Sequence, residues 1–321
     1  MKRTFRVMLA ATLAAMGLQQ ATAADRAWPS GPVQLVVPAK AGGGTDVMAR
    51  VFSEYLQREI KSPVVVVNQP AGGGTVAFET VRTAKPDGRT LLFNHTGTLV
   101  YFHTGRYDHP VSAFTTIAIM QGYPPQVYAV GAKAPWNTMK DFVEDARRNP
   151  GKRVFGVALG GTSHFIAGQV MRSEDVKFKL VESASEVDKV TAIQGGHIDI
   201  GNMGAGAARQ FVASGKLKVL AMIDEEPNPK FPEFVPAVKQ GVKASWFAPL
   251  VLWGPPGMDP AVVKAVNTAT RNMATDATVR QQLDKMSSTF TYRSVEQAQA
   301  LIKAEDEKIG ALARDLGLAR K

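Results

Sequence analysis

Two glycine-rich segments carry the residues best suited to chemistry in this sequence. The first runs Ala41-Gly42-Gly43-Gly44-Thr45-Asp46, and the second, thirty residues later, runs Ala71-Gly72-Gly73-Gly74-Thr75. Each follows a stretch with strand character and opens a stretch with helical periodicity. Glycines in such a turn let the backbone approach a ligand, and the free N–H groups and dipole of a helix N-terminus favour an anion. The segments therefore predict an anion site; the alternative is that the glycines only permit tight turns.

The anion expected at these loops is small and resembles a carboxylate rather than a nucleotide. No Gly-Lys-Ser/Thr follows at the spacing of a P-loop, and the GxGxxG dinucleotide fingerprint is absent. Asp46 is expected to cap the helix or to complement its dipole rather than to act as a catalytic acid. Lys40 stands directly before the first loop. It either adds a charge-assisted bond to the anion or points into solvent, and the sequence leaves both alternatives open.

Three further segments follow predicted strands, where ligands of open α/β sheets bind. The first contains His95, Thr96, Gly97 and Thr98, and the second is Gly160-Gly161-Thr162-Ser163-His164, which opens another helix. Asn202-Met203-Gly204, after a strand ending at Ile200, is expected to complete the wall of the ligand site. The candidate ligand-binding residues are Lys40, Gly42, Gly43, Gly44, Thr45, Asp46, Thr96, Gly97, Thr98, Gly161, Thr162, Ser163, His164, Asn202, Met203 and Gly204.

Patterns typical of enzymes are weak in this chain. Ser163 and His164 are adjacent in sequence, which does not make a nucleophile and base pair, and no G-x-S-x-G elbow occurs. The histidines lack metal-ligand spacing, and no pair of carboxylates stands out for acid and base work. We therefore expect no catalytic residue, no metal and no cofactor. A secreted hydrolase that uses Ser163 and a histidine is the least favoured alternative.

The elements that must position the glycine loops follow an alternating pattern. Residues 33–37, 64–67 and 90–93 have strand character, and the apolar residues of 45–60 and of about 75–84 recur with helical spacing. Strand, helix, strand, helix, strand predicts a parallel sheet. Because residues 64–67 are all valine, this segment is expected to be a buried parallel strand.

The same pattern begins again further along the chain and predicts a second α/β lobe. A helix capped by Thr138 precedes a series of strands, with further helices between them, and the strands are expected at residues 154–158, 178–181, 197–200 and 218–222. A strand over 246–253 follows, then a helix with Asp259 as cap and Pro260 at its first position. The last helix opens with a capping box at Ser294 and Gln297. We infer a hinged pair of lobes with a cleft between them and a C-terminal return to the first lobe.

The N-terminus has the features of an export signal. Met1-Lys2-Arg3 is basic, Val7 to Leu18 is apolar, and Ala21-Thr22-Ala23 has the small-residue pattern of a cleavage site. A mostly apolar run of twelve residues is too short to span a bilayer as a helix. A signal peptide over residues 1–24, cleaved near Ala23 or Ala24, predicts a periplasmic protein. The chain has no cysteine, which excludes a lipid anchor at the cleavage point and disulfide bonds.

The charge balance favours anionic partners. The chain has 38 Lys and Arg against 28 Asp and Glu, a formal net charge of +10, and loss of Lys2, Arg3 and Arg6 with the signal peptide would leave +7. The basic residues are spread along the chain and do not alternate with aromatic residues. We therefore expect no nucleic-acid partner.

Taken in order, these motifs resemble the Bug/TctC receptors of tripartite tricarboxylate transporters. The resemblance covers essentially the whole mature chain. Its motifs are Trp28-Pro29-Ser30-Gly31-Pro32, the first glycine loop, Pro63-Val64-Val65-Val66, Asn68-Gln69-Pro70-Ala71-Gly72-Gly73-Gly74, Lys85-Pro86-Asp87-Gly88-Arg89-Thr90-Leu91-Leu92, Asn149-Pro150-Gly151-Lys152, Gly161-Thr162-Ser163-His164 and Ser214-Gly215-Lys216-Leu217-Lys218-Val219-Leu220-Ala221.

The resemblance implies a fold and a function. The fold would be a type II-like periplasmic binding protein, each lobe a mostly parallel sheet flanked by helices, with residues 25–127 and about 246–321 in lobe 1 and 128–245 in lobe 2. Loops 40–46 and 161–164 would hold a carboxylate of the ligand from opposite sides. Ligands of the family include di- and tricarboxylates, acidic amino acids and aromatic acids. The partner would be a two-component membrane permease, and we expect the receptor to be monomeric.

Two departures from the family pattern bear on the ligand. Ala39 and Lys40 stand where relatives usually have an aromatic residue and a proline, and residues 202–206 lack an acidic residue that many relatives carry. Both changes favour a more anionic ligand over an amino acid, whose ammonium group needs an acidic partner. A sensor of the same fold that serves a signalling kinase is the main alternative to a transport receptor.

Overall fold

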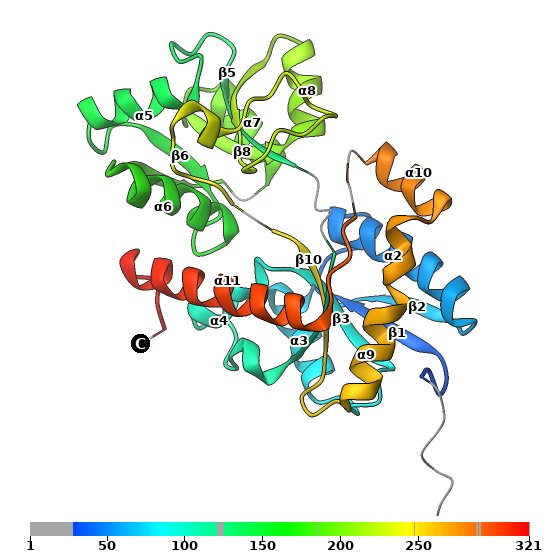
Figure 1. Cartoon of the computed structure of the whole chain (residues 1–321). Helices are drawn as coiled ribbons and strands as arrows, with labels where there is room; N and C mark the ends of the chain where they lie inside the picture. The colour runs from blue at the N-terminus through cyan, green and yellow to red at the C-terminus, as the bar shows by residue number, and fades with distance from the viewer. Residues whose placement is uncertain are drawn as a thin grey trace, which may run out of the picture.

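The computed structural model describes residues 28–120, 125–183, 185–246, 248–286, 288 and 290–320. The expected signal peptide, residues 1–24, lies outside the described residues. Two five-stranded sheets, each flanked by helices, form two lobes that face each other (Figure 1). The predicted two-lobed α/β fold is confirmed. Within the described ranges, no helix is both long and apolar enough to cross a membrane.

The first sheet has the strand order β2-β1-β3-β10-β4. Strand β1 pairs in parallel with β2 and β3, whereas β10 is antiparallel to β3 and β4. Its strands are β1 (Val33–Val37), β2 (Val64–Asn68), β3 (Thr90–His95), β4 (Thr115–Met120) and β10 (Leu250–Gly254). The helices with this sheet are α2 (Gly44–Ile60), α3 (Thr75–Arg82), α4 (Thr98–His103), α9 (Pro260–Ala269), α10 (Ala277–Lys285) and α11 (Val295–Asp315), with short 3₁₀ turns η1 (Ala71–Gly74), η2 (Val111–Ala113) and η4 (Arg271–Ala274).

The second sheet repeats this plan in the order β7-β6-β8-β5-β9. Strands β7, β6 and β8 are parallel, and β5 is antiparallel to β8 and β9. Its strands are β5 (Gln126–Gly131), β6 (Val154–Val157), β7 (Lys179–Glu182), β8 (Ile200–Gly204) and β9 (Leu217–Met222), and its helices are α5 (Met139–Arg148), α6 (Thr162–Glu174), α7 (Glu186–Gln194) and α8 (Ala205–Ala213), with the 3₁₀ turn η3 (Ala237–Gln240). Strand β5 is the first strand after the chain leaves the first sheet, and β10 is the first strand after the chain returns to it. Each of these two strands is antiparallel to both of its neighbours.

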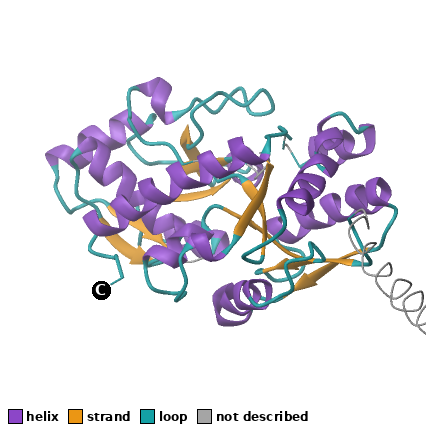
Figure 2. Cartoon of the chain, turned by 60° about the horizontal axis from the view of Figure 1, so that its bottom comes forward, coloured by secondary structure: helices purple, strands orange, loops and turns teal. Residues whose placement is uncertain are grey.

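The hydrophobic core continues from one lobe into the other. One face of the first sheet packs under α2, α9 and α10, and one face of the second sheet packs under α7 and α8. The opposite faces belong to a single buried cluster that contains Val36 of the first sheet, Tyr128 and Phe155 of the second, and Ile309 and Leu312 of α11. Helices lie on both sides of the strands (Figure 2). Apolar packing along α11 therefore joins the two lobes.

The predicted helix starts are confirmed where a capping residue marked them. Thr138 accepts the backbone N–H of Asp141 in a capping box at α5, and Ser294 forms a capping box with Gln297 at α11. Asp259 accepts the N–H of Ala261 at the start of α9. These caps satisfy backbone donors that a helix cannot pair internally. The cap at Ser294 fixes the start of the long helix α11, which contacts β4 and α4 of the first lobe and α6 of the second.

Two strand predictions were wrong in physically informative ways. Strand β2 is not buried on both faces, because it lies at the edge of the sheet and Val65 is 51% exposed. A run of valines is compatible with a strand at the edge of a sheet as well as with a central strand. Strand β8 begins at Ile200 rather than at His197, so residues 202–204 lie within the strand and not in a loop after it. The small and polar residues Gly201 and Asn202 interrupt the apolar run, yet β5 pairs with both of them and β6 pairs with Gly201 on the other side.

Two other parts of the fold also differed from the sequence reading. The predicted strand over 246–253 is shorter, because β10 begins at Leu250, directly after Pro249. Strands β4 and β5 were not predicted. Strand β4 is the last strand of the first sheet before the chain passes to the second lobe, and β5 is the first strand after it.

Candidate functional site

The first glycine loop joins β1 to α2 and is exposed. Residues 40–44 are all exposed, and Gly42 has a φ of +82°, a conformation that favours glycine. Gly43 is the residue before the first helical turn, and the N–H of Val47 is bonded to its carbonyl. The N–H groups of Gly44 and Thr45 precede that first intrahelical bond, and helix geometry gives them no partner within α2. The loop therefore has the donors that an anion site needs.

Asp46 holds this loop in place. It is 2% exposed, and its carboxylate accepts the N–H of Gly42 at 2.8 Å, the Nδ2 of Asn68 at 2.9 Å and two bonds from Arg50 at 3.0 Å. Burial raises the pKa of Asp46, but the bonds from Arg50, Gly42 and Asn68 outweigh it and hold the pKa below its usual value. Asp46 is the third residue of α2 rather than its cap, and its oxygens are turned toward the protein.

The second glycine loop is shaped by its packing. Gly72, Gly73 and Gly74 all have positive φ, at 61°, 69° and 101°. A Cβ on Gly74 would lie 2.7 Å from the Cβ of Pro38, at the end of β1. Its positive φ and its close approach to Pro38 therefore account for the glycine at position 74 without a ligand.

Two of the predicted ligand loops, from different lobes, meet in the structure. A Cβ built on Gly97 would lie 2.7 Å from the Oγ1 of Thr162. Thr96 and Thr98 on either side of Gly97 are buried, and Gly161 is the cap residue of α6. Gly97 therefore permits the 96–98 loop to lie against the N-terminus of α6.

A histidine stabilises each of these two loops in the same way. The Nδ1 of His95 accepts the N–H of Gly97 at 3.0 Å, and the Nδ1 of His164 accepts the N–H of Gly160 at 3.0 Å. Burial lowers the pKa of His95 to about 4 and holds the pKa of His164 below its usual value. A ring nitrogen that accepts a hydrogen bond has no proton, so each neutral ring carries its proton on Nε2. Each loop thus gains an N–H donor without a positive charge.

Ser163 also bonds to its own loop. Its Oγ accepts the N–H of Ala158 at 2.7 Å, and the N–H of Gly161 is bonded to the carbonyl of Ala158 at 2.9 Å. The bonds of Ser163 and His164 fix residues 158–161 onto α6, and neither of these bonds joins the two side chains. The hydroxyl proton of Ser163 is available to an acceptor outside the loop.

The third predicted ligand segment, residues 202–204, forms hydrogen bonds within the second lobe. Asn202 accepts the ammonium of Lys189 at 2.9 Å and donates to Gln126 at 3.0 Å. Met203 is 1% exposed and lies in the hydrophobic core, so packing accounts for its side chain. The N–H of Gly204 donates to a carboxylate oxygen of Glu186 at 2.7 Å. Of these three residues, Asn202 and Gly204 have polar partners near the end of β8.

Lys189 and Glu186 were missed by sequence reasoning. Lys189 is 3% exposed, and burial lowers its pKa to about 8 although Glu186 and Glu182 act in the opposite direction. Its signal was present in the sequence, because Lys189 lies one turn before Ile193 on the buried side of α7. Glu186, at the start of α7, places a carboxylate beside Gly204 at the end of β8.

Arg106 links the lobes and was also missed. Its guanidinium donates to the carbonyl of Leu159 at 2.8 Å and lies 5.6 Å from the ring centroid of Tyr101. Tyr101 belongs to α4 of the first lobe, whereas Leu159 precedes α6 of the second. Arg106 follows Gly105 in a loop, and nothing in its spacing marks it as an interlobe residue.

The site therefore offers hydrogen-bond donors from both lobes. Backbone N–H groups begin α2 and α6, hydroxyls come from Thr162 and Ser163, and the neutral His164 adds a ring N–H group. Over the residues that the structure describes, no group of three or more His, Asp or Glu side chains is arranged as a metal site. This arrangement is suited to holding an anion through hydrogen bonds.

Most of the chain is similar to known proteins in sequence and in fold. Residues 48–318 match the family described as "Tripartite tricarboxylate transporter family receptor". A relative from Cupriavidus necator, "UPF0065 protein in gbd 5'region", is 29% identical over 322 residues, which cover 98% of this chain and 97% of the relative.

Solved structures share the fold. A TctC solute binding protein from Polaromonas, solved without ligand, has a TM-score of 0.77 and 27% identity, covering 90% of this chain and 99% of that one. MatC from Rhodopseudomonas palustris with bound malate has a TM-score of 0.71 and 22% identity, covering 89% and 99%. The likeness to MatC is evidence for the fold alone.

Proposed function

Because this chain belongs to the family of tripartite tricarboxylate transporter receptors, we propose that it captures a small organic carboxylate between its lobes and delivers it to a two-component membrane permease. The family consists of solute-binding receptors and not of enzymes, and its receptors are periplasmic. For this chain we propose export through the signal peptide over residues 1–24, cleaved near Ala23 or Ala24. The proposed lobes are residues 25–127 with about 246–321, and residues 128–245.

The observation that carries the proposal is the approach of Gly97 to Thr162. It brings a predicted ligand loop of one lobe against a predicted ligand loop of the other. A receptor of this class encloses its ligand between lobes, so residues from both must meet around it. We propose that the ligand carboxylate accepts bonds from the N-termini of α2 and α6, from Thr162, and from the Nε2 of His164.

The proposed ligand class is a di- or tricarboxylate or an aromatic acid. The formal net charge of +7 expected after loss of the signal peptide favours an acid with more than one carboxylate, and malate is the ligand bound in MatC, which shares the fold. Lys40 is exposed beside the first glycine loop, where we propose that it pairs with a second carboxylate. The absence of an acid at 202–206 is a weaker argument against amino acids than the sequence suggested, because Glu186 reaches Gly204.

A thermal-shift screen of the mature protein against organic acids tests the proposal. A ligand at about 100 times its dissociation constant adds roughly 2.7 kcal/mol of stability, so the melting temperature should rise with succinate, malate, citrate or an aromatic diacid. Failure of every carboxylate would contradict the proposed function. Preference for aspartate or glutamate would contradict the proposed ligand class.

Variants separate the role of Lys40 from general charge effects. Lys40→Gln should weaken binding of a dicarboxylate strongly and of a monocarboxylate little, whereas Lys85→Gln, at another exposed lysine of the first lobe, should change neither. Turnover of an ester that Ser163→Ala abolishes would favour the hydrolase alternative. Carboxylate uptake that persists after deletion of the gene would favour the sensor alternative.

A further inference from the structure

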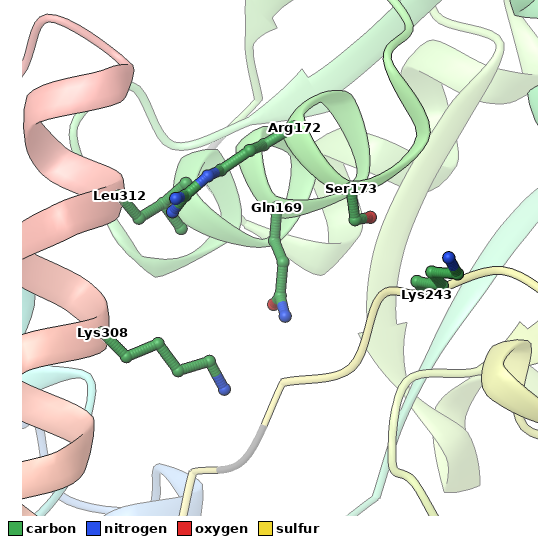
Figure 3. Close-up of a pocket in the computed structure, with 6 residues that line it drawn as sticks. All are labelled: Gln169, Arg172, Ser173, Lys243, Lys308 and Leu312. Atoms are coloured by element: carbon green, nitrogen blue, oxygen red, sulfur yellow. The ribbon is translucent and has the colours of Figure 1, made fainter.

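A pocket lies apart from the glycine loops, between α6, α11 and the segment that carries Lys243. Its volume is about 280 Å³. It is lined by Gln169, Arg172, Ser173, Lys243, Lys308 and Leu312. Figure 3 shows Gln169 and Lys308 reaching from opposite helices into the same space. None of the predicted ligand-binding residues lines this pocket.

The pocket lining is cationic. Three of its six side chains are basic, and none is acidic. Arg172 pairs with Asp315 at 2.8 Å, and Lys308 pairs with Glu305 at 3.7 Å, but both carboxylates lie outside the lining. A guanidinium has five N–H donors and an ammonium has three, so one ion pair does not exhaust either group. Donors therefore remain for an anion within the pocket.

A buried hydroxyl in the same lining points to a missing partner. The Oγ of Ser173 is buried and has no hydrogen-bond partner among the described residues. Leaving such a group unpaired typically costs about 1–3 kcal/mol. An oxyanion in the pocket would accept charge-assisted hydrogen bonds from the basic side chains, and the hydroxyl of Ser173 would gain an acceptor when its side chain turns toward the ion.

We propose that this pocket binds a small dianionic oxyanion of the phosphate class, which connects α6 to α11. The volume lies near the lower end of small-molecule pockets, which favours an ion of this size over a nucleotide. Helix α6 begins at Thr162, after the loop of Gly160 and Gly161, and α11 packs on β4 and α4 of the first lobe. An oxyanion held by Ser173 and Lys308 therefore connects the two lobes on a face distinct from the glycine loops, whatever the cleft binds.

Titration of the mature protein with inorganic phosphate, followed by calorimetry in a buffer without other oxyanions, tests the site. The double variant Lys243→Gln/Lys308→Gln should weaken phosphate binding by about tenfold or more. Sulfate should compete with phosphate in the wild type. Lys303→Gln, which removes an exposed lysine from the same helix α11 but not from the pocket, should leave phosphate binding unchanged.

Two further measurements locate the ion. In the wild type, phosphate should slow hydrogen exchange in α6 and α11, and the double variant should lose this protection. Circular dichroism and melting temperature check that both variants are folded. Absence of saturable binding below several millimolar phosphate would overturn the proposal, as would binding that Lys40→Gln weakens and the double variant does not, since the ion would then lie at the glycine loops.

Discussion

At the scale of single residues, Gly97 is where the lack of a side chain matters most. Its φ is not in the left-handed region, so backbone strain does not explain the glycine. The reason is space, since an added Cβ would meet the ring of His95 within the loop and the Oγ1 of Thr162 across the lobes. The first contact exists whenever the loop is folded, whereas the second exists only when the lobes meet.

We predict that Gly97→Ala weakens binding of the carboxylate ligand by about tenfold, because overpacking costs about 1–3 kcal/mol and tenfold corresponds to 1.4 kcal/mol. Calorimetric titration measures this change. In a double-mutant cycle, Gly97→Ala should cost less when Thr162→Ala has removed the facing hydroxyl.

Gly131→Ala is the control for Gly97→Ala. Gly131 ends β5, and a Cβ there would meet only Ile193, at 3.6 Å, an ordinary van der Waals distance. This change should leave ligand affinity unaltered. Equal losses of affinity at Gly97 in the presence and absence of the Thr162 hydroxyl would show that the interlobe contact is not responsible.

At the scale of elements, the first turn of α2 shapes the loop that precedes it. Asp46 reaches back to the N–H of Gly42 and sideways to Asn68 at the end of β2. Strand β1, strand β2 and helix α2 are therefore tied together where the glycine loop leaves the sheet. The loop keeps its exposed N–H groups in position because a buried carboxylate, rather than a bulky side chain, fixes its path.

Asp46→Ala should lower the free energy of unfolding by about 2 kcal/mol, since hydrogen bonds to a charged group contribute about 1.5–3 kcal/mol. It should also weaken ligand binding because the loop loses its anchor. Denaturant unfolding and calorimetry measure the two effects. Asp188→Ala at the same third position of α7, where the carboxylate is exposed, should cost no more than about 1 kcal/mol. A stability loss no larger at Asp46 than at Asp188 would contradict the anchoring role.

The sequence predicted the positions of helices and strands better than it predicted which of them pack together. Periodicity and caps located α2, α5, α9 and α11, because those signals are local. The position of β2 at a sheet edge and the start of β8 depend on which strands pair beside them, and spacing along the chain does not encode this. The loops at Gly97 and Thr162 were recognised separately as strand ends. Their contact, and the buried network of Lys189 with Asn202, arise only from tertiary packing.

At the scale of the whole molecule, two sheets of the same plan are joined by features of different strength. The hydrophobic cluster along α11 is continuous and buried, so it forms the permanent part of the junction. The bond from Arg106 to the carbonyl of Leu159 is exposed and lies beside the ligand loops. A polar contact of this kind forms and breaks at little cost, and is suited to a junction that opens for a ligand.

Arg106→Ala should therefore change the free energy of unfolding by no more than about 0.5 kcal/mol, as expected for an exposed side chain. It should weaken carboxylate binding several-fold and increase the radius of gyration of the ligand-free protein. Calorimetry and small-angle scattering measure these changes. Arg320→Ala is a matched control, because Arg320 is also exposed and donates to a backbone carbonyl at 2.8 Å, that of Asp108, away from the second-lobe loop at Leu159. If both variants behave alike, the contact between Arg106 and Leu159 does not hold the lobes together, and their closure depends on α11 and the ligand.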